Sequence, residues 1–166
     1  MKLVKELIPY IIIIIVVVLV RSFIITPVKV DGPSMEKTLY DGDILLLEKY
    51  DKDYERFDVV VLKYNNDKLV KRVIGLPGDR VEYKHDTLYI NGEEIKESFI
   101  DEKTENFSLK ELGYNVIPEG YYFVVGDNRN NSLDSRYIGL LKKDDIEGKV
   151  IFRIFPFKSF GKISNN

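Results

Sequence analysis

A serine close to a lysine raises the possibility of nucleophilic catalysis. The segment GPSMEKTLYDGD, at residues 32–43, places Ser34 three residues ahead of Lys37. A serine hydroxyl becomes a good nucleophile when a neighbouring base takes its proton, and histidine is the common base. The only histidine, His85, lies in the polar segment YKHDTLYING beside a predicted hairpin, so we expect it at the surface. If Ser34 is a nucleophile, its base should therefore be a lysine.

Lys37 is the nearer candidate for this base. Ser34-Met-Glu-Lys37 matches the S-x-x-K motif of β-lactamases and penicillin-binding proteins, in which a helix places the serine and the lysine on one face. Those enzymes also need S-D-N and K-T-G elements, and neither tripeptide occurs in this sequence. A penicillin-binding type of acyl enzyme therefore stays an alternative with weak support.

Lys71 is the second candidate, in the predicted strand KLVKRVIG at residues 68–75. Strand side chains alternate between faces, so Lys71 and Arg72 point to opposite faces, and each has apolar neighbours two residues away. At least one of the two cations should then be desolvated. Desolvation lowers a lysine pKa from about 10.4, whereas a guanidinium stays charged, and a general base near neutral pH works best at a pKa of about 7–8. Lys71 suits this role, and a hairpin with two basic residues at its rim is the structural alternative.

A polar loop forms a third cluster. GDNRNNSLDSRYIG, at residues 126–139, follows the apolar run YYFVV and is rich in turn-forming Asp and Asn. Asp127 and Asp134 are its only carboxylates and the EF-hand spacing is absent, so a calcium site is not expected. The alternation of acids and arginines favours a salt-bridged support. With no cysteine and one histidine, we expect neither a metal centre nor an organic cofactor.

The elements that position these residues are predicted to be β-strands. LPGD at residues 76–79 is a turn signal, and Asn91-Gly92 between apolar residues predicts a two-residue hairpin. No helical pattern continues beyond Phe23, and the polar residues 100–117 are expected to form a surface excursion. The strands are predicted from apolar runs at residues 43–50, 56–64, 68–75, 121–125 and 148–155. The fold is therefore expected to be mainly β, as a barrel or as coiled sheets.

The N-terminal apolar run predicts a transmembrane helix at residues 7–25. Its nineteen residues would span about 28 Å as a helix, close to the ~30 Å of a bilayer's hydrocarbon layer. A cleaved secretory signal is the alternative, but the following RSFIITPVKVDG lacks a small-x-small cleavage site. We therefore expect a short tail at residues 1–6, an uncleaved anchor and one folded domain at residues 26–166. The net charge of -2, with no basic block, argues against nucleic acid as a partner.

Taken together, these segments resemble type I signal peptidases, the membrane-bound Ser/Lys proteases that remove signal (leader) peptides from exported preproteins. The match is collinear over nearly the whole chain, with the anchor followed by VDGPSMEKTL (30–39), DGDILLLEK (41–49), KRVIGLPGD (71–79) and IPEGYYFVVGDNRNNSLDSRYIG (117–139). The resemblance implies coiled antiparallel β-sheets and a catalytic domain on the extracytoplasmic face of the plasma membrane. It also implies a single-pass anchor with a cytoplasmic N-terminus, preprotein substrates and proximity to the export machinery.

The resemblance assigns roles to individual residues. Ser34 matches the nucleophile and Lys71 the general base. Met35 matches the residue that packs beside the active site, and Ser132 matches the hydroxyl that orients the lysine amine. The positions that match the supporting ion-pair network are Arg72, Asp127, Asp134 and Arg136.

Three positions depart from the family pattern. Lys37 replaces the proline of S-M-x-P-T-L, and Asn130 stands where an aspartate is common. Gly32 occupies the position at which some members supply a serine hydroxyl to the oxyanion hole, so this chain would depend on the Ser34 backbone N–H and a glycine N–H. These departures keep open a different class of function, a membrane-tethered β-rich binding module without catalysis.

Overall fold

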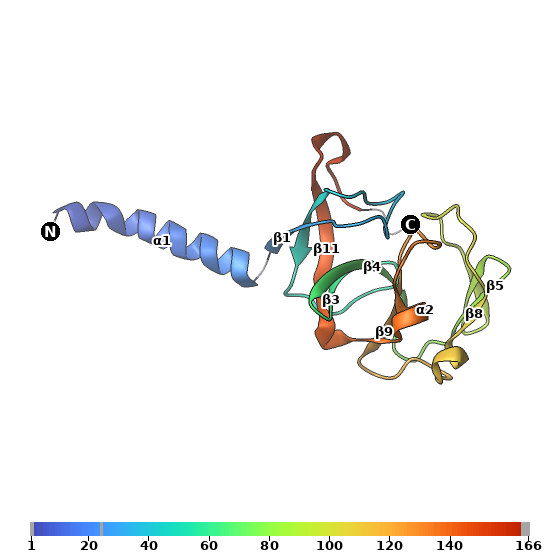
Figure 1. Cartoon of the computed structure of the whole chain (residues 1–166). Coiled ribbons are helices and arrows are strands. Elements are labelled where there is room, and N and C mark those ends of the chain that lie inside the picture. The colour runs from blue at the N-terminus through green and yellow to red at the C-terminus, as the bar shows by residue number, and fades with distance from the viewer. Residues whose placement is uncertain (1, 24, 164–166) are drawn as a thin grey trace.

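A computed structural model of the chain describes residues 2–23 and 25–163, and it places every strand in one β domain. Figure 1 shows helix α1 (Lys2–Phe23) extending away from this domain, which it joins through β1 (Ile25–Lys29). The mainly β, antiparallel fold expected from the sequence is confirmed.

The bounds of α1 differ from the predicted 7–25. The helix includes Lys2 to Glu6, where lysine and glutamate are good helix formers, and it ends at Phe23. Residue 24 lies outside the described residues, and Ile25 opens β1 instead of closing the helix. Pro27 explains part of this change, because the residue before a proline is biased away from the helical conformation towards an extended one.

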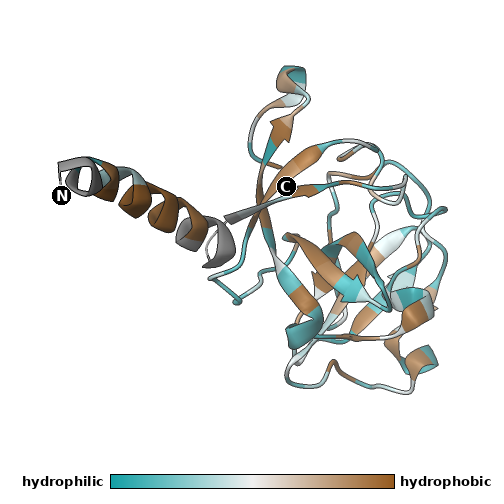
Figure 2. Cartoon of the chain, turned by 60° about the vertical axis from the view of Figure 1, so that its left-hand side comes forward, coloured by the Kyte–Doolittle hydropathy of each residue, from teal (hydrophilic) through white to brown (hydrophobic). Residues whose placement is uncertain are grey.

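The described side chains of α1 are largely apolar and exposed. Residues 7–18 are exposed around the helix, and Figure 2 shows the apolar colour along its middle turns. Within the chain as the structure describes it, no helix is long and apolar enough to cross a membrane. The expected anchor also includes residues 19–25, whose side chains lie outside the described set.

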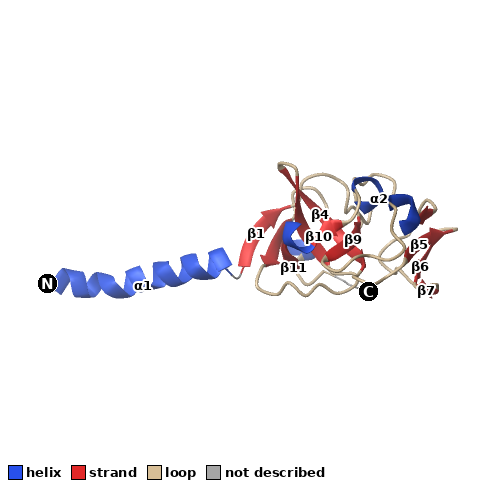
Figure 3. Ribbon diagram, turned by 90° about the horizontal axis from the view of Figure 1, so that it is seen from below, coloured by secondary structure: helices blue, strands red, loops and turns tan. Residues whose placement is uncertain are grey.

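Two antiparallel sheets form the domain (Figures 1 and 3). The larger sheet has the order β1-β2-β11-β3-β4-β9-β10 and the smaller one the order β7-β6-β5-β8. The larger sheet contains β1 with β2 (Ile44–Glu48), β3 (Val59–Tyr64), β4 (Asp67–Gly75), β9 (Tyr121–Val125), β10 (Leu141–Lys142) and β11 (Ile146–Phe155). The smaller sheet contains β5 (Val81–Lys84), β6 (Thr87–Ile90), β7 (Glu93–Ile95) and β8 (Phe107–Ser108). The short helices are α2 (Ser135–Ile138) and the 3-10 turns η1 (Leu109–Leu112), η2 (Lys143–Asp145) and η3 (Phe157–Ser159).

The predicted turns are present. Ile90 of β6 pairs with Glu93 of β7, and Asn91-Gly92 turns with φ values of 55° and 90°. Two positive φ values are what a two-residue hairpin of this type requires, and Asn and Gly tolerate them best. In LPGD, Asp79 N–H donates to Leu76 O at 3.0 Å. Both signals were therefore sufficient to predict the local chain reversal.

Residues 100–117 are not a plain surface excursion. Phe107, Leu109 and Ile117 are buried in a core cluster with Tyr83 and Phe123, which joins the smaller sheet to β9 of the larger one. The segment alternates apolar and polar residues only briefly, at 107–109, and η1 follows at once behind a Ser108–Glu111 capping box. The apolar stretch was too short to separate from the polar surroundings, so its contribution to the core was missed.

Candidate active site

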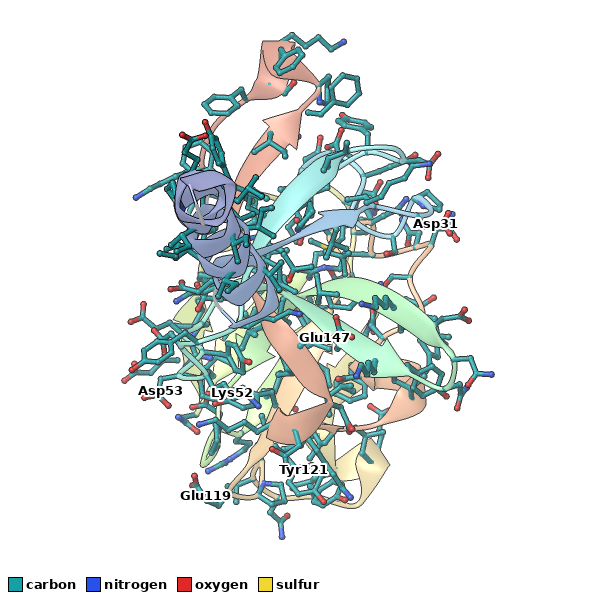
Figure 4. The ribbon with its side chains drawn as sticks, turned by 90° about the vertical axis from the view of Figure 1, so that its left-hand side faces the viewer. Asp31, Lys52, Asp53, Glu119, Tyr121 and Glu147 are labelled. Atoms are coloured by element: carbon teal, nitrogen blue, oxygen red, sulfur yellow. The ribbon has the colours of Figure 1, made fainter. Side chains whose placement is uncertain are left out.

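Ser34 lies on a closed loop between β1 and β2. Val30 N–H donates to Asp43 O at 2.8 Å and Gly42 N–H donates to Val30 O at 3.0 Å, which ties the two ends of the loop together. We call residues 30–43 the nucleophile loop, and Asp31, labelled in Figure 4, marks its start. Met35 is only 1% exposed and anchors the loop in the core beneath the large sheet. Ser34, the residue before this buried methionine, is partly exposed.

Lys71 reaches Ser34 from the adjacent part of the large sheet. It lies on β4 opposite Val60 of β3, one residue before the pairing with β9 begins, and a hydrogen bond of 2.6 Å joins its Nζ to Ser34 Oγ. Lys71 Nζ also donates to Val70 O at 2.9 Å, which holds the amine in place. The structure thus brings together the serine and the more distant of the two candidate lysines.

Burial perturbs the Lys71 amine. Lys71 is 1% exposed, and desolvation lowers its pKa to about 8 against the opposing charges of Asp134 and Asp127. Removing a charge from water disfavours the protonated amine, whereas a nearby carboxylate favours it. A substantial neutral fraction is therefore present at mildly alkaline pH, when a proton can be accepted from a hydroxyl.

Lys37 and His85 are placed elsewhere. Lys37 forms ion pairs with Asp101 and, at 3.5 Å, with Glu102, and its φ of 85° is not helical. The S-x-x-K motif needs a helical turn to bring its lysine back onto the serine, and the nucleophile loop does not provide one at this point. His85 is exposed in the turn between β5 and β6, as the sequence predicted.

A buried ion pair supports the pair of candidate residues. Arg72 and Asp127 are both 0% exposed, and the guanidinium binds the carboxylate in a fork, with Nε–Oδ1 and Nη2–Oδ2 distances of 2.8 and 2.6 Å. Thr38 Oγ1 donates to the same carboxylate at 2.6 Å. Asp127 therefore joins β4, the polar loop after β9 and the nucleophile loop. The Phe99 ring covers Arg72, with 3.9 Å between the guanidinium carbon and the ring centroid.

A second pair organises the polar loop itself. Asp134 is 0% exposed and accepts from Gly126 N–H at 3.0 Å, while Arg136 Nε and Nη2 each donate to its carboxylate at 2.9 Å. Arg136 Nη2 also donates to Arg129 O at 2.9 Å. The residues expected to form an ion-pair network thus form two pairs. Arg72 of β4 binds Asp127, and Arg136 binds Asp134 within the polar loop.

Ser132 lies beside the nucleophile loop without a hydrogen bond. Its Oγ is buried and has no partner within residues 2–23 and 25–163. Gly126 explains how close the two loops come, because a Cβ there would collide with Ser132 Oγ and lie 2.5 Å from Ser34 O. Ser132 is therefore near the pair of candidate residues, but the lysine-orienting bond implied by the resemblance is not among the hydrogen bonds of the described chain.

The departures from the family pattern lie at exposed or partly exposed positions. Gly32 has a φ of 85°, and its N–H donates to Asp41 Oδ1 at 3.1 Å, so this glycine N–H is already engaged. Asn130 is exposed on the polar loop. The Ser34 N–H has no acceptor among the described residues, which leaves it available as a donor.

Several supporting residues were missed in the sequence. Arg129 is 2% exposed and binds Glu97 at 2.6 Å as well as the Tyr83 hydroxyl and Thr104, which links the polar loop to the smaller sheet. Thr38, on the nucleophile loop, donates to Asp127 of the polar loop, and Asn128, on the polar loop, donates to Pro33 O of the nucleophile loop. Their types are common in turns, so a single sequence gave no sign that their partners lie about 90 residues away.

A cavity of about 520 Å³ lies beyond the nucleophile loop, lined by Tyr40, Asp43, Arg153, Phe155 and others, and includes neither Ser34 nor Lys71. Among the described residues, no group of three or more His, Cys, Asp or Glu side chains could hold a metal ion.

Comparisons with known proteins agree with one another on the family of this chain. The family model for signal peptidase, peptidase S26, matches residues 3–155. The signal peptidase IB of Staphylococcus aureus is 43% identical, covering 94% of this chain and 93% of that protein. The signal peptidase I of Bacillus amyloliquefaciens is 42% identical, covering 92% and 88%. The crystal structure of a signal peptidase I from Enterococcus faecalis V583 is similar at 40% identity with a TM-score of 0.56, covering 58% of this chain and 96% of that one. The chain belongs to the signal peptidase family, peptidase S26, and is a serine endopeptidase that cleaves signal peptides.

Proposed function

We propose that this signal peptidase acts through Ser34 as nucleophile and Lys71 as general base. The observation that carries the proposal is the 2.6 Å contact between Ser34 Oγ and the Nζ of a lysine that is only 1% exposed. The neutral amine accepts the hydroxyl proton while Oγ attacks the scissile carbonyl carbon. The Ser34 N–H donates to the oxyanion that forms.

The same amine completes the reaction. Protonated Lys71 gives its proton to the leaving amine as the peptide bond breaks and the acyl-enzyme forms. Lys71, neutral again, then takes a proton from a water molecule as this water attacks the ester carbon. The ester bond breaks, Lys71 returns the proton to Ser34 Oγ, and the cleaved signal peptide leaves with a new carboxylate. The pKa of about 8 suits both steps, because the amine is then close to half protonated at mildly alkaline pH.

The supporting residues have separate roles in this proposal. The Arg72–Asp127 pair fixes β4 at the residue that follows Lys71 and, through Thr38, the loop that carries Ser34. The Asp134–Arg136 pair shapes the polar loop that brings Ser132 beside the nucleophile loop. We assign to the unpartnered Ser132 hydroxyl the orientation of the lysine amine during the reaction. Support for this role is its burial without a partner, since a buried hydroxyl without a hydrogen bond is costly.

The substrate is proposed to bind as an extended strand. β9 pairs with β4 from Arg72 onwards, so the described pairing leaves residues 67–71 of β4 bonded on the β3 side alone. An extended peptide can add to such an edge through backbone hydrogen bonds, with pockets for alternate side chains. This position would carry the scissile bond past Ser34.

We further propose that α1 anchors the enzyme in the plasma membrane. Its exposed apolar side chains at residues 7–18 support this, because large exposed apolar surfaces mark sites that contact membranes or proteins. The N-terminus would be cytoplasmic and the β domain extracytoplasmic, near the export machinery that delivers preproteins. Ser34 lies nine positions after Ile25 in the chain, which is at most about 32 Å of extended chain, so the site would stay close to the bilayer.

Cleavage of a preprotein in detergent tests the dyad. We expect Ser34→Ala and Lys71→Ala to be inactive, and Lys37→Ala to keep most of its activity because Lys37 binds acidic side chains instead of Ser34. Normal cleavage by Ser34→Ala would refute the proposal, and a dead Lys37→Ala beside an active Lys71→Ala would favour the S-x-x-K mechanism. Covalent labelling of Ser34 by a serine-directed acylating inhibitor would separate the enzyme from a non-catalytic binding module.

A further inference from the structure

Asn128 contacts both peptide groups that flank the C-alpha atom of Ser34. Its backbone N–H donates to Ser34 O at 3.1 Å, and its side-chain Nδ2 donates to Pro33 O at 3.1 Å. The orientation of the side-chain amide follows from the chemistry of the partner, because a carbonyl oxygen can only accept. Asn128 therefore holds the nucleophile residue from two sides, although it lies on the polar loop after β9.

The contact with Pro33 O determines the direction of the Ser34 N–H. Both groups belong to the same peptide unit, which is planar and trans, so the N–H points away from the C=O. A donor that fixes the direction of the carbonyl therefore also fixes the direction of the N–H, which lies in the same plane and points the opposite way. The second donor to Pro33 O is the Glu36 N–H, at 3.0 Å, from the turn that follows.

The same contact strengthens the Ser34 N–H as a donor. Hydrogen bonds in a chain polarise one another, so a peptide whose carbonyl accepts two hydrogen bonds donates more strongly. This matters because Gly32 has no hydroxyl to offer and its own N–H is bound to Asp41. The Ser34 N–H, which has no acceptor in the described chain, is the donor left for an oxyanion.

We infer that Asn128 is a positioning residue that orients and polarises the Ser34 N–H, and so compensates for the missing hydroxyl at Gly32. The inference rests on the proposed function of Ser34. Asn128 itself touches neither the reacting atoms nor Lys71 in any described hydrogen bond. Its effect should therefore appear in the rate of acylation and not in the protonation of the base.

Two variants of the full-length enzyme test this role. Asn128→Ala removes the side-chain donor and keeps the backbone N–H that binds Ser34 O. Asn128→Asp keeps the shape but turns a carboxylate oxygen towards the Pro33 carbonyl, so that two acceptors face each other. Asn130→Asp is the matched control, because Asn130 lies two residues further along the same loop and is exposed.

Steady-state cleavage of a preprotein in detergent measures the effect. We expect kcat to fall roughly tenfold in Asn128→Ala, which corresponds to about 1.4 kcal/mol, and further in Asn128→Asp. KM and the midpoint of the pH–rate profile should stay those of the wild type, as should every constant of Asn130→Asp. Thermal unfolding monitored by circular dichroism identifies folded variants, and if Asn128→Asp does not fold, Asn128→Ala decides.

The outcomes separate this inference from the proposed function. An unchanged kcat in a folded Asn128 variant overturns the inference. A change in KM alone would instead indicate a role in substrate binding, and a shifted pH midpoint would indicate an effect on Lys71, so either result overturns it as well. In each of these cases the proposed Ser34–Lys71 dyad keeps its support if the wild type cleaves the preprotein and Ser34→Ala does not. Wild-type enzyme without Ser34-dependent cleavage would instead refute the dyad and the role of Asn128 together.

Discussion

The cost of burying the Lys71 amine should be visible in protein stability. Burial lowers the pKa of Lys71 from 10.5 to about 8 in the folded protein. Between these two values the unfolded chain binds the proton and the folded chain does not, so the free energy of unfolding rises with pH in this window. At ~1.36 kcal/mol per pKa unit, the total rise attributable to Lys71 is about 3 kcal/mol. Below pH 8 the full cost is present, and above pH 10.5 it has disappeared.

Replacing Lys71 with methionine isolates this contribution. Methionine has similar bulk and no charge, so Lys71→Met should lack the rise while other titrating groups, among them Tyr54 and Tyr83, affect both proteins alike. Urea unfolding of both proteins between pH 7 and 11, followed by circular dichroism in detergent, gives the difference in unfolding free energy at each pH. We expect the wild type to gain about 3 kcal/mol on the variant across the window.

A second lysine variant serves as the control for Lys71→Met. Lys142→Met removes an exposed lysine on β10 and controls for the loss of a lysine as such. If the wild-type and Lys71→Met stabilities run parallel with pH, the Lys71 amine is not desolvated in the folded protein. It would then lack the property that makes it a competent base, whatever its distance from Ser34.

Three further perturbations follow from the buried network. Asp134→Asn removes a charge that raises the pKa of Lys71, so the midpoint of the pH–rate profile should move to lower pH, and a move to higher pH would contradict the electrostatic account. Asp127→Asn removes the carboxylate charge that binds the buried Arg72 guanidinium and should lower the urea-unfolding free energy by about 3–5 kcal/mol; a loss below about 1 kcal/mol would show that water reaches this ion pair. Gly126→Ala places a methyl group 2.5 Å from the carbonyl oxygen of the nucleophile and should abolish preprotein cleavage, whereas near-normal kcat would mean that the two loops separate without cost.

The sequence contained enough information to single out Ser34 and Lys71 as candidate residues and to predict much of the β-structure. Lys71 stands out because a lysine and an arginine occupy adjacent positions of an apolar strand, and the structure buries both, at 1% and 0% exposed. Asn91-Gly92 and LPGD predicted turns because the conformations they need suit few other residues. Each of these signals involves residues that are close together in the chain, so a single sequence is enough to detect it.

The contacts between loops could not be predicted in this way. Thr38 binds Asp127 and Asn128 binds Pro33 across about 90 residues of chain, and nothing in the neighbourhood of either residue marks its partner. Residue 25, the first of the strand at residues 25–29, was assigned to the helix because it continues the preceding apolar run. Phe107 and Leu109 were hidden in a polar segment, because two buried side chains are too few to form a period.

The direct passage from α1 into β1 limits where the chain can be shortened. β1 pairs with β2 over its whole length, from Ile25 with Glu48 to Lys29 with Ile44, and the nucleophile loop starts at the next residue. A truncated enzyme that begins before Ile25 keeps this strand and the fixed start of the loop. One that begins after Lys29 exposes the backbone donors and acceptors with which β2 binds β1, which favours aggregation, and the nucleophile loop then begins at the chain end.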